Sequence, residues 1–314
     1  MSALANLFLF AVGLAFVIVG GDLFVSSSVA IAERARLPKV LVGGTLVSLA
    51  TTCPELAVSA TASLRGNASI ALGNAVGSVI CNIGVIIGVL CILRPMPVER
   101  SDFRFPSLFM LGSGVLLAIL TLPLRLGRAA GVLLIGCAAL YLALDYLRHA
   151  RRQREPDCAA GGRMGLWKSV AVFVLGAALV IAGSRLLTDG AVGLAKVLGV
   201  PKIVIGLTLV ALGTSLPELV TAVTSARKGV PELSLGNVVG ANIMNMTLIT
   251  GVAAAIAPLE MERTTQLYNL PAMLAFCAAL LAMARTGGQL TRREGFAFLG
   301  LYAAYVAGLA AVSG

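Results

Sequence analysis

Hydrophobic segments fill most of this chain, and short polar turns separate them. Each segment has about 20 or more residues, which is enough to cross the hydrocarbon core of a bilayer. The segments lie near residues 5–30, 38–65, 69–92, 105–124, 128–147, 167–193, 201–227, 232–256, 266–284 and 294–313. The period-two alternation of a transmembrane barrel does not occur. The pattern predicts an all-α polytopic membrane protein with ten transmembrane helices.

The composition supports the same interpretation. Charged residues make up 12% of the 314 residues and hydrophobic residues 58%, whereas a soluble domain has about 25% charged residues. The N-terminal hydrophobic stretch has no basic segment before it and no convincing cleavage site. We therefore expect a retained first span and not a signal peptide.

The chain contains two copies of one repeat. When Pro38 is aligned with Pro201, about 23 of the 52 positions from Pro38 to Val89 are identical to their partners without a gap. We call this register the repeat alignment. Each copy has five hydrophobic segments, so the second copy must enter the membrane in the opposite orientation. Such inverted-topology repeats are typical of secondary transporters, whose substrate site lies near the bilayer midplane. We predict a first repeat over residues 1–163, which includes a basic connecting loop, and a second over residues 164–314.

The net charge of +10 is concentrated in turns on one predicted side of the membrane. The densest basic stretch, Arg148 to Lys168, joins the repeats, and no aromatic residues interleave with its arginines, so nucleic-acid binding is disfavoured. Because cytoplasmic loops are rich in Arg and Lys, we predict a cell-membrane protein with a cytoplasmic central loop and both termini outside the cytoplasm. His149 is expected to be a solvated residue of this loop. The other turns assigned to the cytoplasm contain Arg34, Arg36, Arg94, Arg100, Arg104, Arg227, Lys228, Arg285, Arg292 and Arg293.

Two glutamates lie inside predicted spans, at the same position of each repeat. Glu55 and Glu218 each follow a proline, and an ionisable residue within a span is a functional hypothesis by default. A single buried glutamate could also serve an interhelical ion pair, but neither span has a nearby Arg or Lys. Pro54 lacks an N–H, so it frees the carbonyl of Ala50 four residues earlier. Unwound backbone of this kind lines cavities and coordinates cations in transporters.

Further oxygen-bearing side chains recur at helical spacing around the glutamates. In the first repeat these are Ser48, Thr51 and Thr52, followed in the next segment by Asn74, Ser78 and Asn82. The second repeat offers Thr214, Ser215, Asn237 and Asn245, with Ala211 and Ala241 in place of Ser48 and Ser78. All are hard oxygen donors, which suit Ca²⁺. The six cysteines are scattered, so a soft-metal site and a disulfide framework are disfavoured.

These motifs resemble those of the calcium/cation antiporter superfamily, in particular its prokaryotic sodium/calcium exchanger branch. The second repeat has "GTSLPEL" and "GNVVGANIMN", and the first has "ATTCPEL" and "GNAVGSVICN". The resemblance covers nearly the whole chain. It implies cation ligation by the side chains of Glu55, Glu218, Thr51, Thr52, Thr214, Ser215, Ser78, Asn82 and Asn245, and by backbone carbonyls near Ser48 and Ala211.

The chain departs from the family pattern at several of these positions. Ala50 and Thr52 replace the usual Gly and Ser, Val79 replaces an Asn, and Ala241 replaces a Ser that would supply an oxygen. Some relatives have Asp where this chain has Asn245, so the predicted site has two formal negative charges. These departures bear on the sodium stoichiometry and on the identity of the driving ion.

We expect a secondary antiporter that exchanges Ca²⁺ for Na⁺ by alternating access, with the cation bound at the midplane between the repeats. A proton-coupled cation exchanger is the alternative, because H⁺ could neutralise the glutamates, and a cation channel is a weaker one. No enzymatic activity and no cofactor are expected. The expected partners are Ca²⁺, Na⁺ and the lipid bilayer, and a monomer is expected to suffice for transport.

Overall fold

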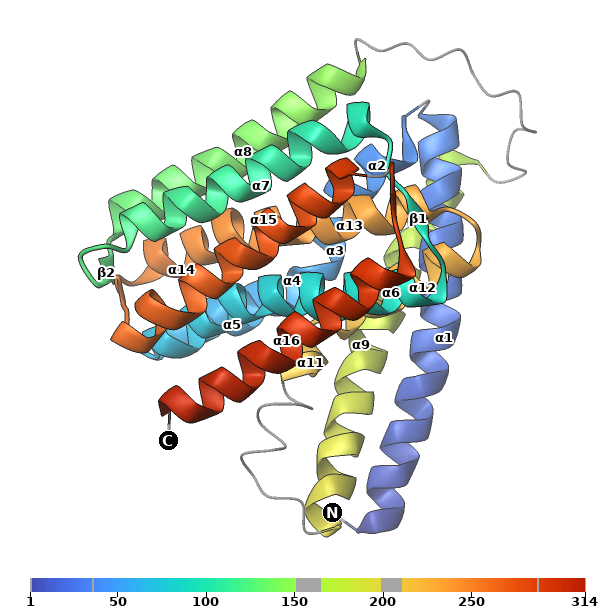
Figure 1. Cartoon of the computed structure of the whole chain (residues 1–314). Helices are drawn as coiled ribbons and strands as arrows, with labels where there is room; N and C mark the ends of the chain where they lie inside the picture. Colours follow the sequence, from blue (N-terminus) through green and yellow to red (C-terminus); the bar gives the residue numbers. More distant parts are fainter. Residues whose placement is uncertain (1, 36, 151–164, 199–210, 287, 314) are drawn as a thin grey trace.

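The computed structural model describes residues 2–35, 37–150, 165–198, 211–286 and 288–313, which are mostly helical (Figure 1). The helices are α1 (Ala3–Arg34), α2 (Lys39–Val42), α3 (Ser48–Thr51), α4 (Cys53–Leu64), α5 (Ala68–Cys81), α6 (Gly88–Leu93), α7 (Arg100–Leu120), α8 (Arg128–Ala150), α9 (Leu166–Val197), α11 (Ala211–Thr214), α12 (Leu216–Arg227), α13 (Pro231–Met244), α14 (Thr250–Ile256), α15 (Leu270–Thr286) and α16 (Arg292–Ser313). The π-helical segments are η1 (Gly43–Val47), η2 (Asn82–Ile87), η4 (Asn245–Ile249) and η5 (Thr265–Asn269). The strands are β1 (Met96–Pro97), β2 (Arg125–Leu126), β3 (Leu259–Glu260) and β4 (Gln289–Leu290).

The described residues confirm a polytopic helical membrane protein. Eight helices or continuous helical segments are long and apolar enough to cross a bilayer. Lys39–Thr51 and Cys53–Leu64 form one further candidate span, bent by 44°. The predicted segment near 201–227 lies partly outside the described residues, and its remainder is α11 and α12. The count of ten spans and the boundary between residues 163 and 164 therefore stay predictions.

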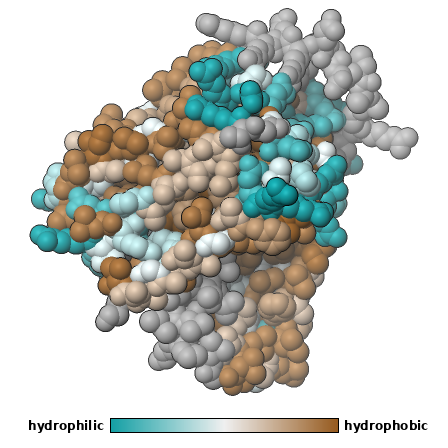
Figure 2. Space-filling model, in the orientation of Figure 1, coloured by the Kyte–Doolittle hydropathy of each residue, from teal (hydrophilic) through white to brown (hydrophobic). Residues whose placement is uncertain are grey.

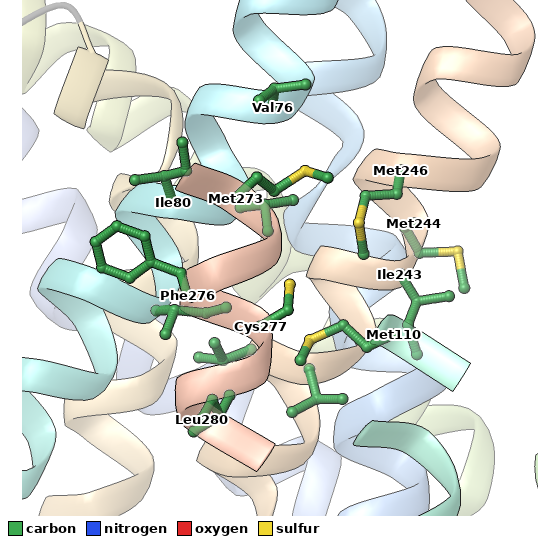
Figure 3. Packing of buried hydrophobic residues seen from close by; sticks show 14 of the residues in the cluster. Val76, Ile80, Met110, Ile243, Met244, Met246, Met273, Phe276, Cys277 and Leu280 are labelled. Atoms are coloured by element: carbon green, nitrogen blue, oxygen red, sulfur yellow. The ribbon is translucent and has the colours of Figure 1, made fainter. Parts of the chain in front are cut away.

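The most buried part of the molecule is formed by two equivalent helical segments. Within them, 72% of the most apolar window of Ile70–Leu93 and 78% of that of Pro231–Ile256 are buried, against 11% for α16. Aliphatic and sulfur side chains fill the space between these segments and α7 and α15, as with Met110, Ile243 and Met273 (Figure 3). The flexible thioethers suit the irregular gaps between crossing helices.

The outer surface is hydrophobic, as a lipid environment requires. Leu4, Phe8 and Ile18 of α1 are 78%, 67% and 62% exposed. Hydrophilic residues gather instead at the ends of the bundle, over β1 and the start of α16 and, as a smaller group, near β2 (Figure 2). The surface is therefore that of a protein with an apolar belt and polar ends.

The two longest helices, α1 and α9, form a pair that extends beyond the rest of the bundle (Figure 1). Each has 32 residues, and they pack along their length. Glycines permit the close approach: a Cβ on Gly176 would come within 2.6 Å of the backbone nitrogen of Phe24, and one on Gly183 within 2.8 Å of that of Val17. Small residues of this kind let membrane helices approach closely.

Two strand pairs show that equivalent spans run in opposite directions. β1 pairs with β4, with Met96 opposite Leu290, and β2 pairs with β3, with Leu126 opposite Leu259. β1 precedes α7 and β2 follows it, whereas β3 precedes α15 and β4 follows it. The start of α7 therefore lies beside the end of α15. Because the repeat alignment carries β1 onto β3, this antiparallel arrangement is what inverted repeats require.

The prediction that His149 is a solvated loop residue is wrong. α8 continues to Ala150, and His149 is only 7% exposed. Its Nδ1 lies 2.8 Å from the carbonyl oxygen of Asp145 and 3.5 Å from the Oδ1 of the same residue. The helix continues past the apolar segment because Asp145, one turn earlier, gives the imidazole a buried polar partner.

Candidate cation-binding site

Both repeats interrupt a helix shortly before the proline that they share. Thr52 separates α3 from α4 with φ −83° and ψ 2°, and Ser215 separates α11 from α12 with φ −87° and ψ 6°. The two breaks fall on the same position of the repeat alignment and have nearly the same backbone conformation. Pro54 and Pro217 follow in the first turn of the new helix, where the absence of an N–H costs no hydrogen bond.

These breaks place the two glutamates in equivalent positions. Glu55 lies in the first turn of α4 and Glu218 in the first turn of α12. Both are fully buried, and all four carboxylate oxygens are without a hydrogen-bond partner among the described residues. Helix α3, which leads into the first break, contacts α12, so the two motifs lie together. Because a buried, uncompensated charge costs several kcal/mol, this arrangement requires a bound cation or protons.

Two asparagines present their amide oxygens without a partner. Asn82 and Asn245 are the first residues of η2 and η4, and such π-helical turns often occur at functional sites. Asn82 Nδ2 donates to Asn242 Oδ1 at 3.0 Å, and Asn245 Nδ2 donates to the Ala241 carbonyl at 3.0 Å. The two Oδ1 atoms are buried, and the described part of the chain provides them with no donor. Anchoring each nitrogen fixes the orientation of the amide, so that its oxygen is available to a cation.

The predicted hydroxyl ligands differ in how they are engaged. Ser215 Oγ is buried and unpartnered within the described ranges. Thr51 Oγ1 lies 3.2 Å from Asn237 Oδ1 of the other repeat and 3.3 Å from the Ser48 carbonyl oxygen. Thr52 Oγ1 donates to the Ser48 carbonyl at 2.8 Å. Of these three hydroxyls, only that of Ser215 has no hydrogen-bond partner among the described residues.

Among the remaining predicted ligands, the oxygens of Ser48 already take part in hydrogen bonds. The Ser48 carbonyl accepts from Thr52 N at 3.0 Å as well as from the Thr52 hydroxyl, and Ser48 Oγ donates to the Thr45 carbonyl at 3.0 Å. Ser78 is 4% exposed on α5, Thr214 is half-buried at the end of α11, and Ala211 begins α11. Ligation by these groups stays a prediction.

Three asparagines at the site support the ligands. The sequence analysis grouped Asn74 and Asn237 with the oxygen-bearing residues around the glutamates but not with the implied ligands, and it did not name Asn242. Asn242 anchors Asn82, and Asn237 accepts from Thr51. Asn74 Nδ2 donates to the Glu55 carbonyl at 3.2 Å and to Ser59 Oγ at 2.9 Å. Asn242 lies three residues before Asn245 in the most buried helix. An asparagine one helical turn from Asn245, in a segment of otherwise apolar or small side chains, is the sequence signal that could have identified Asn242 as a residue of the site.

The donor set suits a hard cation. Two carboxylates, two amide oxygens and a hydroxyl are the oxygen ligands that Ca²⁺ accepts, whereas soft metals require thiolates or imidazoles. Among the described residues, no group of three or more His, Cys, Asp and Glu side chains is placed to bind a metal. The arrangement therefore depends on uncharged oxygens as well as on the two carboxylates.

Comparison with known proteins identifies the family. The family model described as "sodium/calcium exchanger protein" matches residues 5–147 and again residues 168–310. The chain belongs to the sodium/calcium exchanger family. The two matches fall on opposite sides of the basic connecting loop, as a duplicated exchanger unit requires.

Other family members match over nearly the full length. The chain is 31% identical to the sodium/calcium exchanger MaX1 of Methanosarcina acetivorans over 96% of this chain and 97% of that protein. It is 36% identical to the putative antiporter CaxA of Alkalimonas amylolytica over 90% of each chain. The solved structure of the sodium-calcium exchanger NCX_Mj soaked with 10 mM Na⁺ and zero Ca²⁺ has a TM-score of 0.86 and 28% identity, covering 98% of this chain and 99% of that one. These relatives are transporters and not enzymes.

Proposed function

We propose that the chain exchanges Ca²⁺ for Na⁺ across the membrane by alternating access, with the cation bound near the midplane between the two repeats. The observation that carries this proposal is the set of buried oxygens of Glu55, Glu218, Asn82 and Asn245, which have no hydrogen-bond partner among the described residues. The exchanger relatives support both ions, because NCX_Mj was studied with Na⁺ and with Ca²⁺ or Sr²⁺.

The two carboxylates explain why transport is exchange and not leak. An empty site would have to pass through an occluded state with two uncompensated charges, each costing several kcal/mol. One Ca²⁺, or more than one Na⁺, neutralises the pair and removes this barrier. The site therefore changes sides only when it is loaded, which couples the two ions.

The moving part is the α1 and α9 pair, which slides or rocks against the remaining helices. Its extension beyond the bundle and its glycine-rich contact support motion as a unit (Figure 1). In this proposal the central loop is cytoplasmic, both termini are extracytoplasmic, each repeat contributes five spans, and one chain suffices for transport.

The test is Ca²⁺ flux in proteoliposomes. Vesicles loaded with Na⁺ should take up labelled Ca²⁺ when diluted into Na⁺-free buffer, and uptake should cease when Na⁺ is equal on both sides. Glu260→Gln, at an exposed residue of β3, provides a variant with the same chemical change away from the site. Ca²⁺ flux that is independent of any cation gradient would contradict exchange.

A proton-coupled exchanger is the second candidate, because protons could also neutralise the two buried carboxylates, which no described residue partners. A pH gradient imposed without Na⁺ separates the two: it should drive no Ca²⁺ uptake if Na⁺ is the coupling ion. A cation channel would instead give single-channel currents in a planar bilayer, which the proposal does not expect.

A further inference from the structure

A basic groove with an apolar floor lies where α7 and α15 meet at one end of the bundle. Its volume is about 520 Å³. The floor is formed by Val98, Phe103, Leu281 and Ala284, which are 4%, 5%, 7% and 1% exposed. The groove is also lined by the exposed arginines Arg100, Arg104 and Arg285 and by two serines.

The groove is held in shape by contacts between the two repeats. Arg100 Nη2 donates to the Arg285 carbonyl at 2.8 Å, which joins the first turn of α7 to the last turn of α15. The backbone nitrogen of Val98 donates to the Gly288 carbonyl at 2.9 Å, beside the pairing of β1 with β4. Arg104 is left with no ion pair to an acidic residue of the groove, because no described residue that lines it is acidic.

The repeat symmetry provides an internal comparison. The repeat alignment carries Arg100 onto Arg263, but Arg104 onto Leu267 and Arg285 back onto Leu122. Leu267 and Leu122 are 72% and 66% exposed at the opposite end of the bundle. The equivalent place at that end therefore has two exposed leucines instead of two arginines. The arginines are a property of one membrane face and not of the repeat itself.

We propose that this groove binds the headgroup phosphate of an anionic phospholipid, with the acyl chains lying along the apolar floor between α7 and α15. Arginine binds phosphate oxygens through two parallel hydrogen bonds, which a lysine cannot reproduce. Basic pockets between membrane helices on the cytoplasmic side are the expected place for such lipids. The buried floor distinguishes this groove from a surface that is merely positive.

Native mass spectrometry tests the proposal on the purified full chain. Protein supplied with phosphatidylglycerol and phosphatidylcholine should retain phosphatidylglycerol preferentially. The double variant Arg104→Gln/Arg285→Gln should weaken that binding by about 30-fold, as expected for two arginines near a membrane phosphate. Arg263→Gln, which removes a positive charge from the repeat-equivalent place at the other end, should leave the binding unchanged.

Two further measurements test whether the phosphate belongs to a lipid and whether the arginines define the site. Free glycerol 3-phosphate should not displace the lipid, because it lacks the acyl chains that cover the floor. Leu122→Arg/Leu267→Arg should add a second retained lipid. The proposal is overturned if Arg263→Gln weakens binding as much as the double variant, if the double variant binds like the wild type, or if glycerol 3-phosphate competes.

A second inference starts from an ion pair that joins α1 to α12. Lys228 Nζ lies 2.5 Å from Asp22 Oδ1 and donates to Ser26 Oγ at 2.7 Å. The helices are close here, because a Cβ on Gly21 would come within 2.9 Å of the Val220 side chain. The pair therefore connects the α1 and α9 unit to a helix that contributes a carboxylate to the site.

The equivalent residues of the other repeat cannot form this ion pair. The repeat alignment carries Asp22 onto Arg185, and Arg65 onto Lys228. Where α1 and α12 have one acid and one base, α9 and the end of α4 have two arginines. In inverted repeats, the second conformation of the transport cycle exchanges the arrangements of the two halves. That exchange would bring Arg185 towards Arg65, and like charges repel.

We infer that the Asp22–Lys228 pair is a latch that biases the unloaded protein towards the present conformation. This inference rests on the proposed alternating-access function. Hydrogen exchange measured by mass spectrometry tests it without any transport assay, in the absence of Na⁺ and Ca²⁺. Exchange in residues 222–228 should rise about two- to fivefold in Lys228→Gln, as expected for a partly exposed ion pair. The adjacent Arg227→Gln should have no such effect.

Two more variants complete the test: one exchanges the charges of the Asp22–Lys228 pair, and the other creates an equivalent ion pair in the other repeat. Asp22→Lys/Lys228→Asp should restore the protection of residues 222–228. Arg65→Glu, which gives Arg185 an acidic partner, should decrease exchange in residues 59–65. Equal exchange in Lys228→Gln and the wild type would overturn the latch even if Na⁺-driven Ca²⁺ uptake were intact, so its failure is distinct from failure of the proposed function.

Discussion

The two copies of the glutamate motif have the same backbone but different free oxygens. Thr52 and Ser215 occupy the same break, yet the Thr52 hydroxyl donates to its own helix whereas the Ser215 hydroxyl is buried and unpartnered within the described residues. The amide nitrogen of Asn82 is held by a side chain of the other repeat, and that of Asn245 by its own helix. The second copy therefore supplies more of the available oxygens.

The comparison separates what duplication preserves from what substitution changes. The prolines and the helix breaks position the carboxylates alike in both halves. The polar residues around them diverge: Asn242 stands where the first repeat has Val79, and Ala241 where it has Ser78. We interpret the site as one cation position with two equal carboxylates and unequal neutral ligands. Single substitutions can separate the contribution of the carboxylates from that of the neutral ligands.

The largest effect is expected from removing either carboxylate. Glu55→Gln and Glu218→Gln should each reduce Na⁺-dependent Ca²⁺ uptake by at least 100-fold, about 2.7 kcal/mol, because each leaves one negative charge opposite a divalent cation. The measurement is labelled Ca²⁺ uptake into Na⁺-loaded vesicles, with Glu260→Gln as the control. If Glu55→Gln retained uptake while Glu218→Gln abolished it, the two carboxylates would not be equal.

Adding a third charge should have the next largest effect, in the opposite direction. Asn245→Asp keeps the size of the side chain but places a further negative charge at the buried Oδ1 position. Apparent Ca²⁺ affinity should rise about tenfold relative to Na⁺, since a divalent ion gains twice the Coulomb energy of a monovalent one. Competition between labelled Ca²⁺ and Na⁺ measures this ratio. An unchanged ratio would place Asn245 outside the site.

Removing an amide oxygen should cost less than removing a charge. Asn82→Ala and Asn245→Ala should each lower Ca²⁺ affinity about tenfold. This factor corresponds to the free energy of about one hydrogen bond, which we take as the contribution of one neutral oxygen ligand. Asn242→Ala leaves the Asn82 oxygen in place but removes the acceptor that orients it, so a smaller decrease is expected. Calorimetric Ca²⁺ titration gives all three affinities. A decrease for Asn242→Ala as large as for Asn82→Ala would show that orientation, not the oxygen itself, decides binding.

The smallest effect separates the two hydroxyls. Ser215→Ala should lower Ca²⁺ affinity about fivefold because it removes an unpartnered oxygen, and Thr52→Val less than twofold because the Thr52 hydroxyl already donates to the Ser48 carbonyl. The same calorimetric titration compares them. Equal losses would mean that the Thr52 hydroxyl changes partner when the ion binds.

Part of this arrangement followed directly from the sequence. The prolines at positions 54 and 217 predicted broken helices, and the repeat alignment predicted equivalent breaks, which the structure places at Thr52 and Ser215. Family membership followed from the same motifs. The antiparallel α7 and α15 agree with the inverted topology that an odd number of spans per repeat predicts.

Other features depend on tertiary contacts that no local pattern encodes. The π-helical turns at Asn82 and Asn245 fix the directions of the two side chains, and the anchoring of Asn82 requires Asn242, which belongs to the other repeat. The burial of His149 was missed because a basic sequence after an apolar segment is typical of a loop, whereas Asp145 stabilises one more helical turn.

The central claim is that both repeats form one cation site. Calcium titration of the purified full chain by isothermal calorimetry tests it most directly, with Glu55→Gln and Glu218→Gln measured beside the wild type. The account predicts one Ca²⁺ per wild-type chain and no measurable high-affinity binding in either variant. Two Ca²⁺ per chain, with one lost in each variant, would show instead that each repeat has a site of its own.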